Sequence, residues 1–186
     1  MNITEQIAHC FATRGHSEYG GENVTQLEHG LQCAWLAEQA GATPELIVAS
    51  LLHDIGHLLH DLPADAPDHG IDDHHENSGY RFLQLHFTPA VTEPVRLHVA
   101  AKRYLCSVDP GYQTQLSEPS LVSLKLQGGK MSEEELAEFR ASSHWQDALS
   151  LRRWDDLAKV VDLQTPGLQH YLPMISQVAL KQASFQ

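Results

Sequence analysis

The sequence has few cysteines, few basic side chains and no apolar run long enough to cross a membrane. The three cysteines, Cys10, Cys33 and Cys106, form no CxxC pair, which predicts reduced thiols rather than a disulfide framework. The 12 basic residues face 24 acidic ones, and the resulting net charge of −12 disfavours nucleic acid and anionic membranes as partners. No secretion signal is visible. We therefore expect a cytoplasmic protein with no nucleic-acid or membrane partner.

The composition is otherwise that of an ordinary globular domain. The chain has 186 residues, of which 42% are apolar and 19% are charged. It is long enough to bury a core without disulfides or a structural metal ion. Histidine is the exception, because the chain contains 13 of them. We expect a single domain over residues 1–186, and we interpret the excess of histidine as a functional feature.

Apolar residues recur at helical spacing along most of the chain, and no stretch of β-branched residues alternates as in a strand. The pattern predicts an all-α bundle. Thr25 and Glu28 have the spacing of a capping box, which predicts a helix start at Thr25. Thr43 and Pro44 predict the start of the most apolar helix, which we expect to reach about His60.

A His-Asp pair lies in this apolar segment, with a further histidine one helical turn later: His53, Asp54 and His57. A carboxylate has two oxygens, so Asp54 can serve one metal ion with each oxygen, while His53 binds only one ion. An isolated His-Asp pair is more often a salt-bridged helix face than a metal site. Here, other candidate ligands accompany it: His29, His75, His98 and Asp155.

The order of these residues resembles the HD-domain superfamily of metal-dependent phosphohydrolases, in the variant where two additional histidines complete a second metal site. The resemblance implies a metal-binding core over about residues 25–160. The first ion would be held by His29, His53, Asp54 and Asp155, and the second by Asp54, His75 and His98. His74 and His75 are adjacent, so either could be the ligand at this position. The family has a histidine followed by a glutamate here, which matches His75 and Glu76.

Four longer sequence motifs indicate one particular family within this superfamily. Tyr19-Gly-Gly-Glu22 precedes the first histidine of the set, HVAAKRYL begins at His98, Gln127-Gly-Gly follows, and RRWD begins at Arg152. Over about residues 16–171 the chain resembles the mixed-valent diiron oxygenases of the HD fold, which cleave carbon–phosphorus bonds. The resemblance implies an enzyme with two iron ions, Fe(II)/Fe(III), that acts on a small organophosphonate with O2. Mixed histidine and carboxylate ligands suit iron.

The resemblance also implies which residues contact the phosphonate: His57, Lys102, Ser120, Ser123 and Arg152. Lys102 lies one turn after His98, and Arg152 lies one turn before Asp155, so both cations can share the metal-facing side of their helices. Without the family pattern, each cation is more typical of an exposed surface charge. Ser120 is equally typical of a residue that caps a helix N-terminus. His57 is also typical of a core residue or of a residue that hydrogen-bonds to a metal ligand.

Tyr19 and Glu22 are assigned by the resemblance alone. Tyr19 would occupy an open position on the second ion in the resting state and would leave when substrate enters. Glu22 would then receive the ammonium group of the substrate. The resemblance thus gives a catalytic set of Tyr19, Glu22, His57 and Lys102. From the residues alone, Tyr19 and Glu22 are equally well ordinary loop residues before a helix.

The expected reaction is O2-dependent oxidative cleavage of the carbon–phosphorus bond of 1-hydroxy-2-aminoethylphosphonate, giving glycine and phosphate. The same chemistry on (R)-1-hydroxy-2-(trimethylammonio)ethylphosphonate, giving glycine betaine and phosphate, stays open, because Glu22 suits either cation. An HD-type phosphohydrolase that uses Mn, Mg or Zn and needs no O2 is the alternative reaction class. A phosphonate or nucleotide sensor is the alternative to an enzyme, although a sensor would not need six metal ligands.

Overall fold

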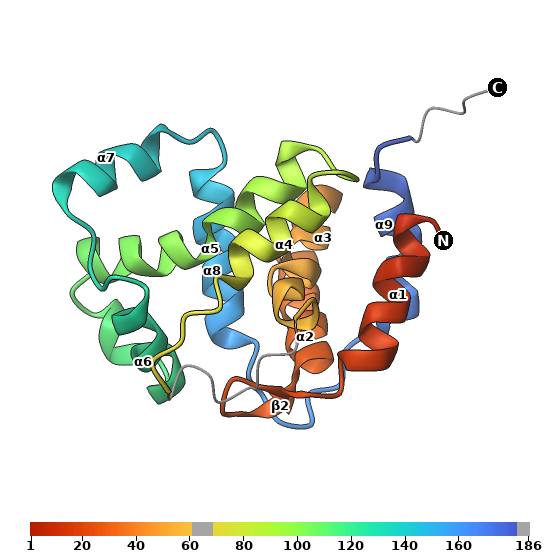
Figure 1. The fold of residues 1–186 in the computed structure, drawn as a ribbon, viewed down its shortest axis with the longest axis horizontal. Coiled ribbons are helices and arrows are strands. Elements are labelled where there is room, and N and C mark those ends of the chain that lie inside the picture. Colours follow the sequence, from red (N-terminus) through yellow and green to blue (C-terminus); the bar gives the residue numbers. More distant parts are fainter. Residues whose placement is uncertain (61–68, 182–186) are drawn as a thin grey trace.

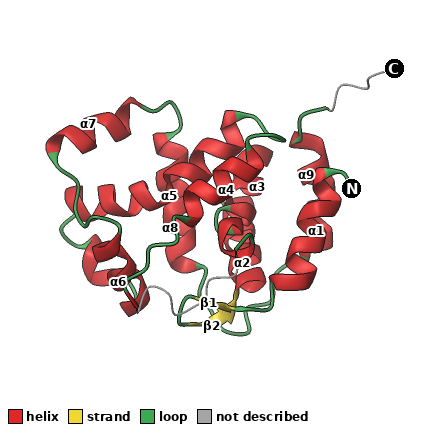
Figure 2. Ribbon diagram, viewed as in Figure 1, coloured by secondary structure: helices red, strands yellow, loops and turns green. Residues whose placement is uncertain are grey.

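Helices make up almost all of the regular structure in the computed structural model, which describes residues 1–60 and 69–181 (Figures 1 and 2). The longer helices are α1 (Ile3–Arg14), α2 (Gln26–Gln39), α5 (Pro89–Val108), α8 (Trp145–Leu157) and α9 (Leu168–Val178). The shorter ones are α3 (Pro44–Leu52), α4 (His75–Leu83), α6 (Glu118–Leu126), α7 (Glu133–Ala141) and the 3-10 turns η1 (Ile55–Leu58) and η3 (Tyr112–Gln115). The predicted all-α class is confirmed.

Local sequence signals set the starts of the two helices that carry the first site residues. The Thr25 side chain accepts a hydrogen bond from the backbone N–H of Glu28, and the Glu28 carboxylate accepts one from the backbone N–H of Thr25. This is the capping box that the spacing predicts. Thr43 caps α3 through the backbone N–H of Leu46, and Pro44 occupies the first turn. These caps fix which residues of α2 and α3 point into the bundle.

The structure also contains a small β-hairpin that the sequence pattern did not predict. β1 (Glu18–Tyr19) pairs antiparallel with β2 (Glu22–Thr25), and Tyr19 lies opposite Glu22. Gly20 and Gly21 form the turn with φ angles of +45° and +80°, which glycine adopts at little cost. The strands are too short and too polar for an alternation signal, so the Gly-Gly pair was the available clue. The hairpin leads directly into α2.

The prediction of one continuous apolar helix to about His60 was wrong. Helix α3 ends at Leu52, and the chain continues as the separate turn η1. The reason is a close backbone approach at Gly56, where a Cβ atom would lie 2.0 Å from the carbonyl oxygen of His75. The start of α4 therefore packs directly on η1. As a result, Asp54 lies at a break between two helical segments instead of inside a helix.

The core lies where α2, α3, α5 and α8 pack together in the middle of the bundle (Figure 1). Its buried side chains include Ala34 from α2, Leu52 from α3, Val95 from α5 and Leu151 from α8. Helices α1 and α9 cover one side of this core, and α6 and α7 lie toward the opposite end (Figure 1). The helices that carry the candidate ligands are thus held by close packing of apolar side chains.

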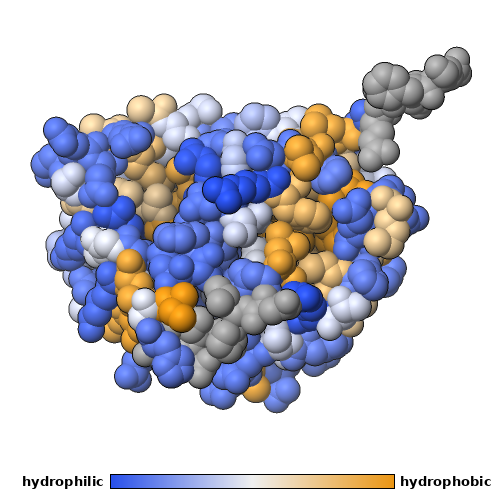
Figure 3. Space-filling model, viewed as in Figure 1, coloured by the Kyte–Doolittle hydropathy of each residue, from blue (hydrophilic) through white to orange (hydrophobic). Residues whose placement is uncertain are grey.

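The face of the molecule shown in Figure 3 is mostly hydrophilic, in agreement with the acidic composition. The larger group of hydrophobic residues on this face lies between α4 and the pair formed by α1 and α9, and a smaller group lies toward α6 (Figure 3). Within residues 1–60 and 69–181, no helix combines the length and the apolar character needed to span a bilayer.

Candidate metal centre

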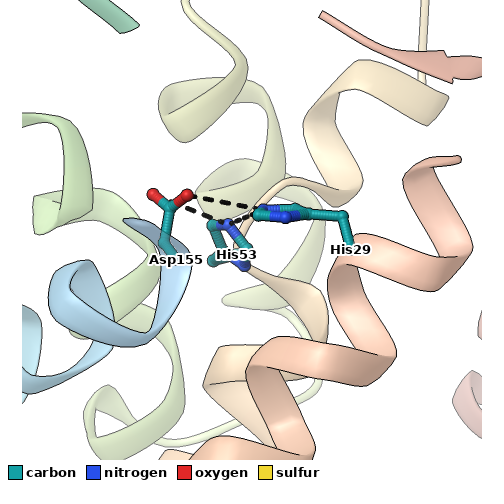
Figure 4. Close-up of side chains that lie close together, drawn as sticks. All are labelled: His29, His53 and Asp155. Carbon is teal, nitrogen blue, oxygen red and sulfur yellow. Dashed lines mark hydrogen bonds and ion pairs between the residues drawn. The ribbon is translucent and has the colours of Figure 1, made fainter. Parts of the chain in front are cut away.

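Three buried residues from three different helical segments meet at the first cluster (Figure 4). His29 comes from α2, His53 from the end of α3, and Asp155 from α8. The Nε2 atoms of His29 and His53 are 3.1 Å apart. The Asp155 carboxylate lies 3.5 Å from His29 Nε2 and 3.9 Å from His53 Nε2. Their ligand atoms are close enough together to bind a single metal ion.

A second cluster adjoins the first and shares Asp54 with it. His75 opens α4 and His98 lies in α5, and their Nε2 atoms are 3.1 Å apart. Asp54 Oδ1 lies 3.3 Å from each of these two nitrogens. Asp54 Oδ2 instead faces the first cluster, 3.2 Å from His53 Nε2 and 3.5 Å from His29 Nε2. The structure therefore brings all six predicted ligands together, with one Asp54 oxygen toward each cluster.

The hydrogen bonds around the clusters fit a metal centre. In His29, His53 and His98, Nδ1 lies within hydrogen-bond distance of a backbone carbonyl oxygen. The carbonyls are those of Ala158, Ser50 and Val95, at 2.8, 2.8 and 2.6 Å, respectively. A carbonyl only accepts, so Nδ1 carries the proton, and Nε2 of a neutral ring keeps its lone pair. Two such lone pairs 3.1 Å apart repel unless the two nitrogens share a proton or a metal ion.

The Asp54 carboxylate adds a second observation in favour of a bound cation. Its Oδ1 atom is buried and has no hydrogen-bond partner. A buried oxygen of this kind is costly unless a donor or a cation satisfies it. Four imidazoles and two carboxylates are ligands that suit first-row transition metals, including iron. The residues present thus fit a two-ion centre.

Asp73 is a functional candidate that the sequence reasoning missed. One of its oxygens lies 2.9 Å from His75 Nδ1, and the other lies 2.6 Å from His57 Nδ1. Such a carboxylate fixes the orientation and the tautomer of a ligand histidine. His57, predicted to contact the phosphonate, also stacks on His75 with ring centroids 3.9 Å apart. The acidic residue two positions before His75 was the available signal.

The structure also resolves the register at the start of α4. The His75 side chain is buried and its Nε2 faces His98, as a ligand requires. The His74 side chain is 66% exposed and lies beside Asp72. His74 also has a φ angle of +49°, which turns the chain into α4. His75 is therefore the residue at the cluster, as the His-Glu step predicts.

Replacing Asp73 by alanine should weaken metal binding at the second cluster by about 10- to 100-fold, because His75 loses the carboxylate that orients it. Asp72→Ala is the matched control, since Asp72 contacts His74 instead. Competition with a calibrated chelator measures the affinity of each variant for iron. Equal effects of the two substitutions would contradict the assigned role of Asp73.

A cavity of about 470 Å³ opens beside the two clusters. All residues predicted to contact substrate line it: Tyr19, Glu22, His57, Lys102, Ser120, Ser123 and Arg152. They come from the hairpin, η1, α5, α6 and α8, so only the folded chain brings them together. Asp54, His75, His98 and Asp155 line the same cavity. A small molecule in this cavity can therefore reach both the candidate ligands and the candidate substrate contacts.

Lys102 brings a buried positive charge to the cavity. Its residue exposure is 3%, and its Nζ donates a hydrogen bond to Ser123 Oγ at 2.7 Å. Burial, together with the neighbouring guanidinium of Arg152, lowers the pKa of Lys102 to about 7. Ser123 Oγ in turn donates to the carbonyl oxygen of Ser120. The buried Lys102 ammonium has a neutral hydroxyl as its hydrogen-bond acceptor, and an anionic group bound in the cavity would stabilise it.

Arg152 is bound by more partners than its spacing alone suggested. Its guanidinium contacts Asp155 at 2.7 Å, forms an ion pair with Asp156, and donates from Nε to the hydroxyl of Tyr112 at 3.1 Å. The Tyr112 hydroxyl also donates to Asp156. Burial raises the pKa of Asp155, but the ion pair with Arg152 outweighs it and keeps the pKa below its usual range. Arg152 thus orients a predicted ligand while lining the cavity. Asp156 and Tyr112 were not singled out from the sequence.

Tyr19 lies against the first cluster. Its ring stacks on His29 with centroids 3.7 Å apart, and its hydroxyl donates to Asp155 at 3.3 Å. Burial and the negative charge of Asp155 hold the pKa of Tyr19 well above its usual value, so the hydroxyl stays protonated. Its expected place on the second ion stays a prediction, because the ring stacking on His29 and the hydrogen bond to Asp155 are with residues of the first cluster.

Glu22 forms an ion pair that the sequence reasoning did not anticipate. Lys159, just after α8, places its Nζ 2.9 Å from Glu22 Oε1. The same oxygen accepts a hydrogen bond from Ser117 at 2.5 Å. No sequence pattern links Lys159 to Glu22, because 137 positions separate them. The expected role of Glu22 as a receptor for the substrate ammonium stays a prediction.

Comparison with known proteins agrees with this geometry. The family model for the HD domain matches residues 27–135. A glycine-betaine-forming dioxygenase of 1-hydroxy-2-(trimethylamino)ethylphosphonate from Leisingera caerulea is 44% identical over 180 residues, which cover 97% of this chain and 92% of the relative. A hydroxymethylphosphonate dioxygenase from Gimesia maris is 52% identical over 159 residues, 84% of this chain and 78% of the relative. The chain therefore belongs to the HD-domain phosphonate oxygenases.

Proposed function

We propose that this enzyme cleaves the carbon–phosphorus bond of a 1-hydroxyphosphonate with dioxygen, releasing phosphate and a carboxylic acid. One O2 per substrate balances the reaction, because the substrate carbon is oxidised to the carboxyl level and both oxygen atoms appear in the products. The observation that carries the proposal is the position of Asp54, with one oxygen toward each cluster beside a cavity that contains Lys102 and Arg152.

Two iron ions, Fe(II)/Fe(III), are the proposed cofactor. The first cluster with Asp54 Oδ2 would hold one ion, and the second cluster with Asp54 Oδ1 would hold the other. Bound iron supplies the redox chemistry with oxygen that side chains cannot provide. Histidine and carboxylate ligands support this assignment. The protein contributes binding, orientation and charge neutralisation.

The side chains around the cavity have separate tasks in this proposal. Lys102 neutralises the phosphonate, Arg152 is a second contact that stays ion-paired with Asp155 and Asp156, and the hydroxyls of Ser120 and Ser123 orient the phosphonate oxygens. His57, held by Asp73, stacks on the ligand His75, lines the cavity and contacts the phosphonate in this proposal. Tyr19, which lines the cavity beside the first cluster, would withdraw from the centre when substrate enters.

The candidate substrates differ in the substituent on the carbon that carries the hydroxyl group. The resemblance predicted an aminomethyl group and hence glycine as product, with Glu22 as the receptor for the ammonium. The names of the two relatives give a trimethylammonium compound and hydroxymethylphosphonate, which carries no cation. All three molecules share a hydroxyl and a phosphonate on one carbon. This shared unit is what the metal centre, together with Lys102 and Arg152, is proposed to bind.

Phosphate release from the three phosphonates, with and without O2, tests the proposal. We expect iron-loaded enzyme to release phosphate only when O2 is present, with one O2 consumed per phosphate. A mixed-valent electron paramagnetic resonance signal should change when the preferred phosphonate is added anaerobically. Phosphate release from an ester in an oxygen-free chamber with Mn, Mg or Zn would instead support the phosphohydrolase. An iron content near zero after growth with iron would contradict the cofactor assignment.

A further inference from the structure

Lys159 binds two separate parts of the cavity wall at once. Besides Glu22 on the hairpin, its ammonium donates to Ser117 Oγ and Ser120 Oγ at the start of α6, at 3.0 Å each. An ammonium group has three N–H donors, and these three contacts match that number. The Lys159 side chain is only 13% exposed. Lys159 is therefore a fixed part of the cavity wall rather than a surface charge.

Glu22 is electrically compensated by this contact. Its side chain is 17% exposed, and a partly buried ion pair at 2.9 Å is much less screened than an exposed one. Burial raises the pKa of Glu22, but hydrogen bonds from Ser117 and Lys159 outweigh it and lower the pKa. Glu22 is thus ionised, and its charge is balanced by Lys159. A cationic substituent of a substrate would not meet an unpaired carboxylate at this position.

The ring of Tyr19, which lies opposite Glu22 in the hairpin, is also in contact with other side chains. Tyr19 stacks on His29, and Lys159 Nζ lies over the Tyr19 ring at 5.8 Å from its centroid. Within the described part of the chain, Tyr19 is the one tyrosine, phenylalanine or tryptophan that lines the cavity. A quaternary ammonium is usually held by a cage of aromatic faces. The described cavity wall provides no such cage, and Lys159 already occupies the cation position at its single tyrosine.

We propose that Lys159 determines substrate choice by keeping Glu22 paired, so that the enzyme prefers a 1-hydroxyphosphonate whose carbon substituent carries no positive charge. This inference rests on the proposed function. Hydroxymethylphosphonate has the required chemistry. A substrate ammonium near Glu22 would have to displace Lys159 and would be repelled by it. Rejection by a like charge is an effective source of specificity.

The ratio of kcat/KM for hydroxymethylphosphonate to that for 1-hydroxy-2-aminoethylphosphonate measures this preference in iron-loaded enzyme. We expect a ratio of at least about tenfold in the unaltered enzyme, which corresponds to a modest electrostatic penalty. Lys159→Gln leaves Glu22 unpaired and should shift the ratio about 10- to 100-fold toward the amino compound. Lys159→Arg keeps the charge and should keep the preference. The trimethylammonium compound, tested in the same way, should follow the amino compound.

The double substitution Lys159→Gln with Glu22→Gln separates charge from structure. It should lose the gain seen for the amino compound, because the carboxylate that would bind the ammonium is gone. A preference of the unaltered enzyme for either cationic substrate, or an unchanged ratio in Lys159→Gln, would overturn the role of Lys159. If no phosphonate is turned over, the proposed function fails. In that case, dissociation constants measured without O2 for hydroxymethylphosphonate and 1-hydroxy-2-aminoethylphosphonate test the role of Lys159, since their ratio should shift in Lys159→Gln in the same direction.

Discussion

Asp54→Asn should abolish paired metal binding and reduce turnover by at least about 10³-fold, since a bound metal ion contributes several kcal/mol to such a reaction. Each Asp54 oxygen faces a different pair of histidines, so one substitution affects both ions. Asparagine keeps the shape of the side chain but removes its charge and replaces one oxygen with an NH2 group that cannot bind a cation. Elemental analysis and phosphate release measure the two effects.

Two further variants show whether the loss in Asp54→Asn comes from a bridging position. His98→Gln removes a ligand of the second cluster only, and we expect it to retain about one ion per chain if ligands of separate clusters act independently. Glu134→Gln alters an exposed carboxylate in α7, where no effect on metal content is expected. If Asp54→Asn still bound two ions, Asp54 would not bridge them.

Lys102→Met should reduce kcat/KM by about 10²- to 10³-fold, because removal of one partner of a buried charged contact typically costs a few kcal/mol. Methionine has a similar length but no charge, so it fills the space of Lys102 without supplying a phosphonate contact. Phosphate release at varied substrate concentration measures the effect, which should include a raised KM. A small effect on kcat/KM would show that Lys102 does not meet the anion.

Lys102→Met should also stabilise the protein at neutral pH when it is measured without substrate. Burial lowers the pKa of Lys102 from 10.5 to about 7, so the unfolded chain binds this proton more tightly than the folded chain. The resulting loss of stability develops as pH falls from about 10.5 to about 7 and is constant below that range. Lys102→Met removes it, and a gain of about 1 kcal/mol would raise Tm by a few degrees. The gain should disappear toward pH 10.

A fall in both Tm and kcat/KM would instead mean that Lys102→Met simply disrupts the fold. The expected combination, lower activity with equal or higher stability, is typical of a residue kept for binding rather than for packing. Ser123→Ala is a useful companion variant, because it removes the hydrogen-bond acceptor of Lys102 and leaves the charge in place. Its effect on kcat/KM should be smaller than that of Lys102→Met.

The fold class was readable from the sequence because helical signals are local. Apolar spacing and the caps at Thr25 and Thr43 depend on residues a few positions apart, and the structure has α2 and α3 beginning where these caps predict. The break before η1 was not readable in this way. It depends on the approach of His75 to Gly56, and a local pattern carries no information about a contact between separate segments.

The sequence by itself determined the family, and the six candidate ligands followed from the resemblance to that family, because the types and order of the donor residues are visible along the chain. Only the tertiary structure decided how those donors are held and what surrounds them. Three ordinary charged residues gain their partners only when folding partly buries them: Asp73 contacts His75, Asp156 contacts Arg152, and Lys159 contacts Glu22. Charges interact strongly only where they are close and shielded from water, so their partners were fixed by packing rather than by spacing.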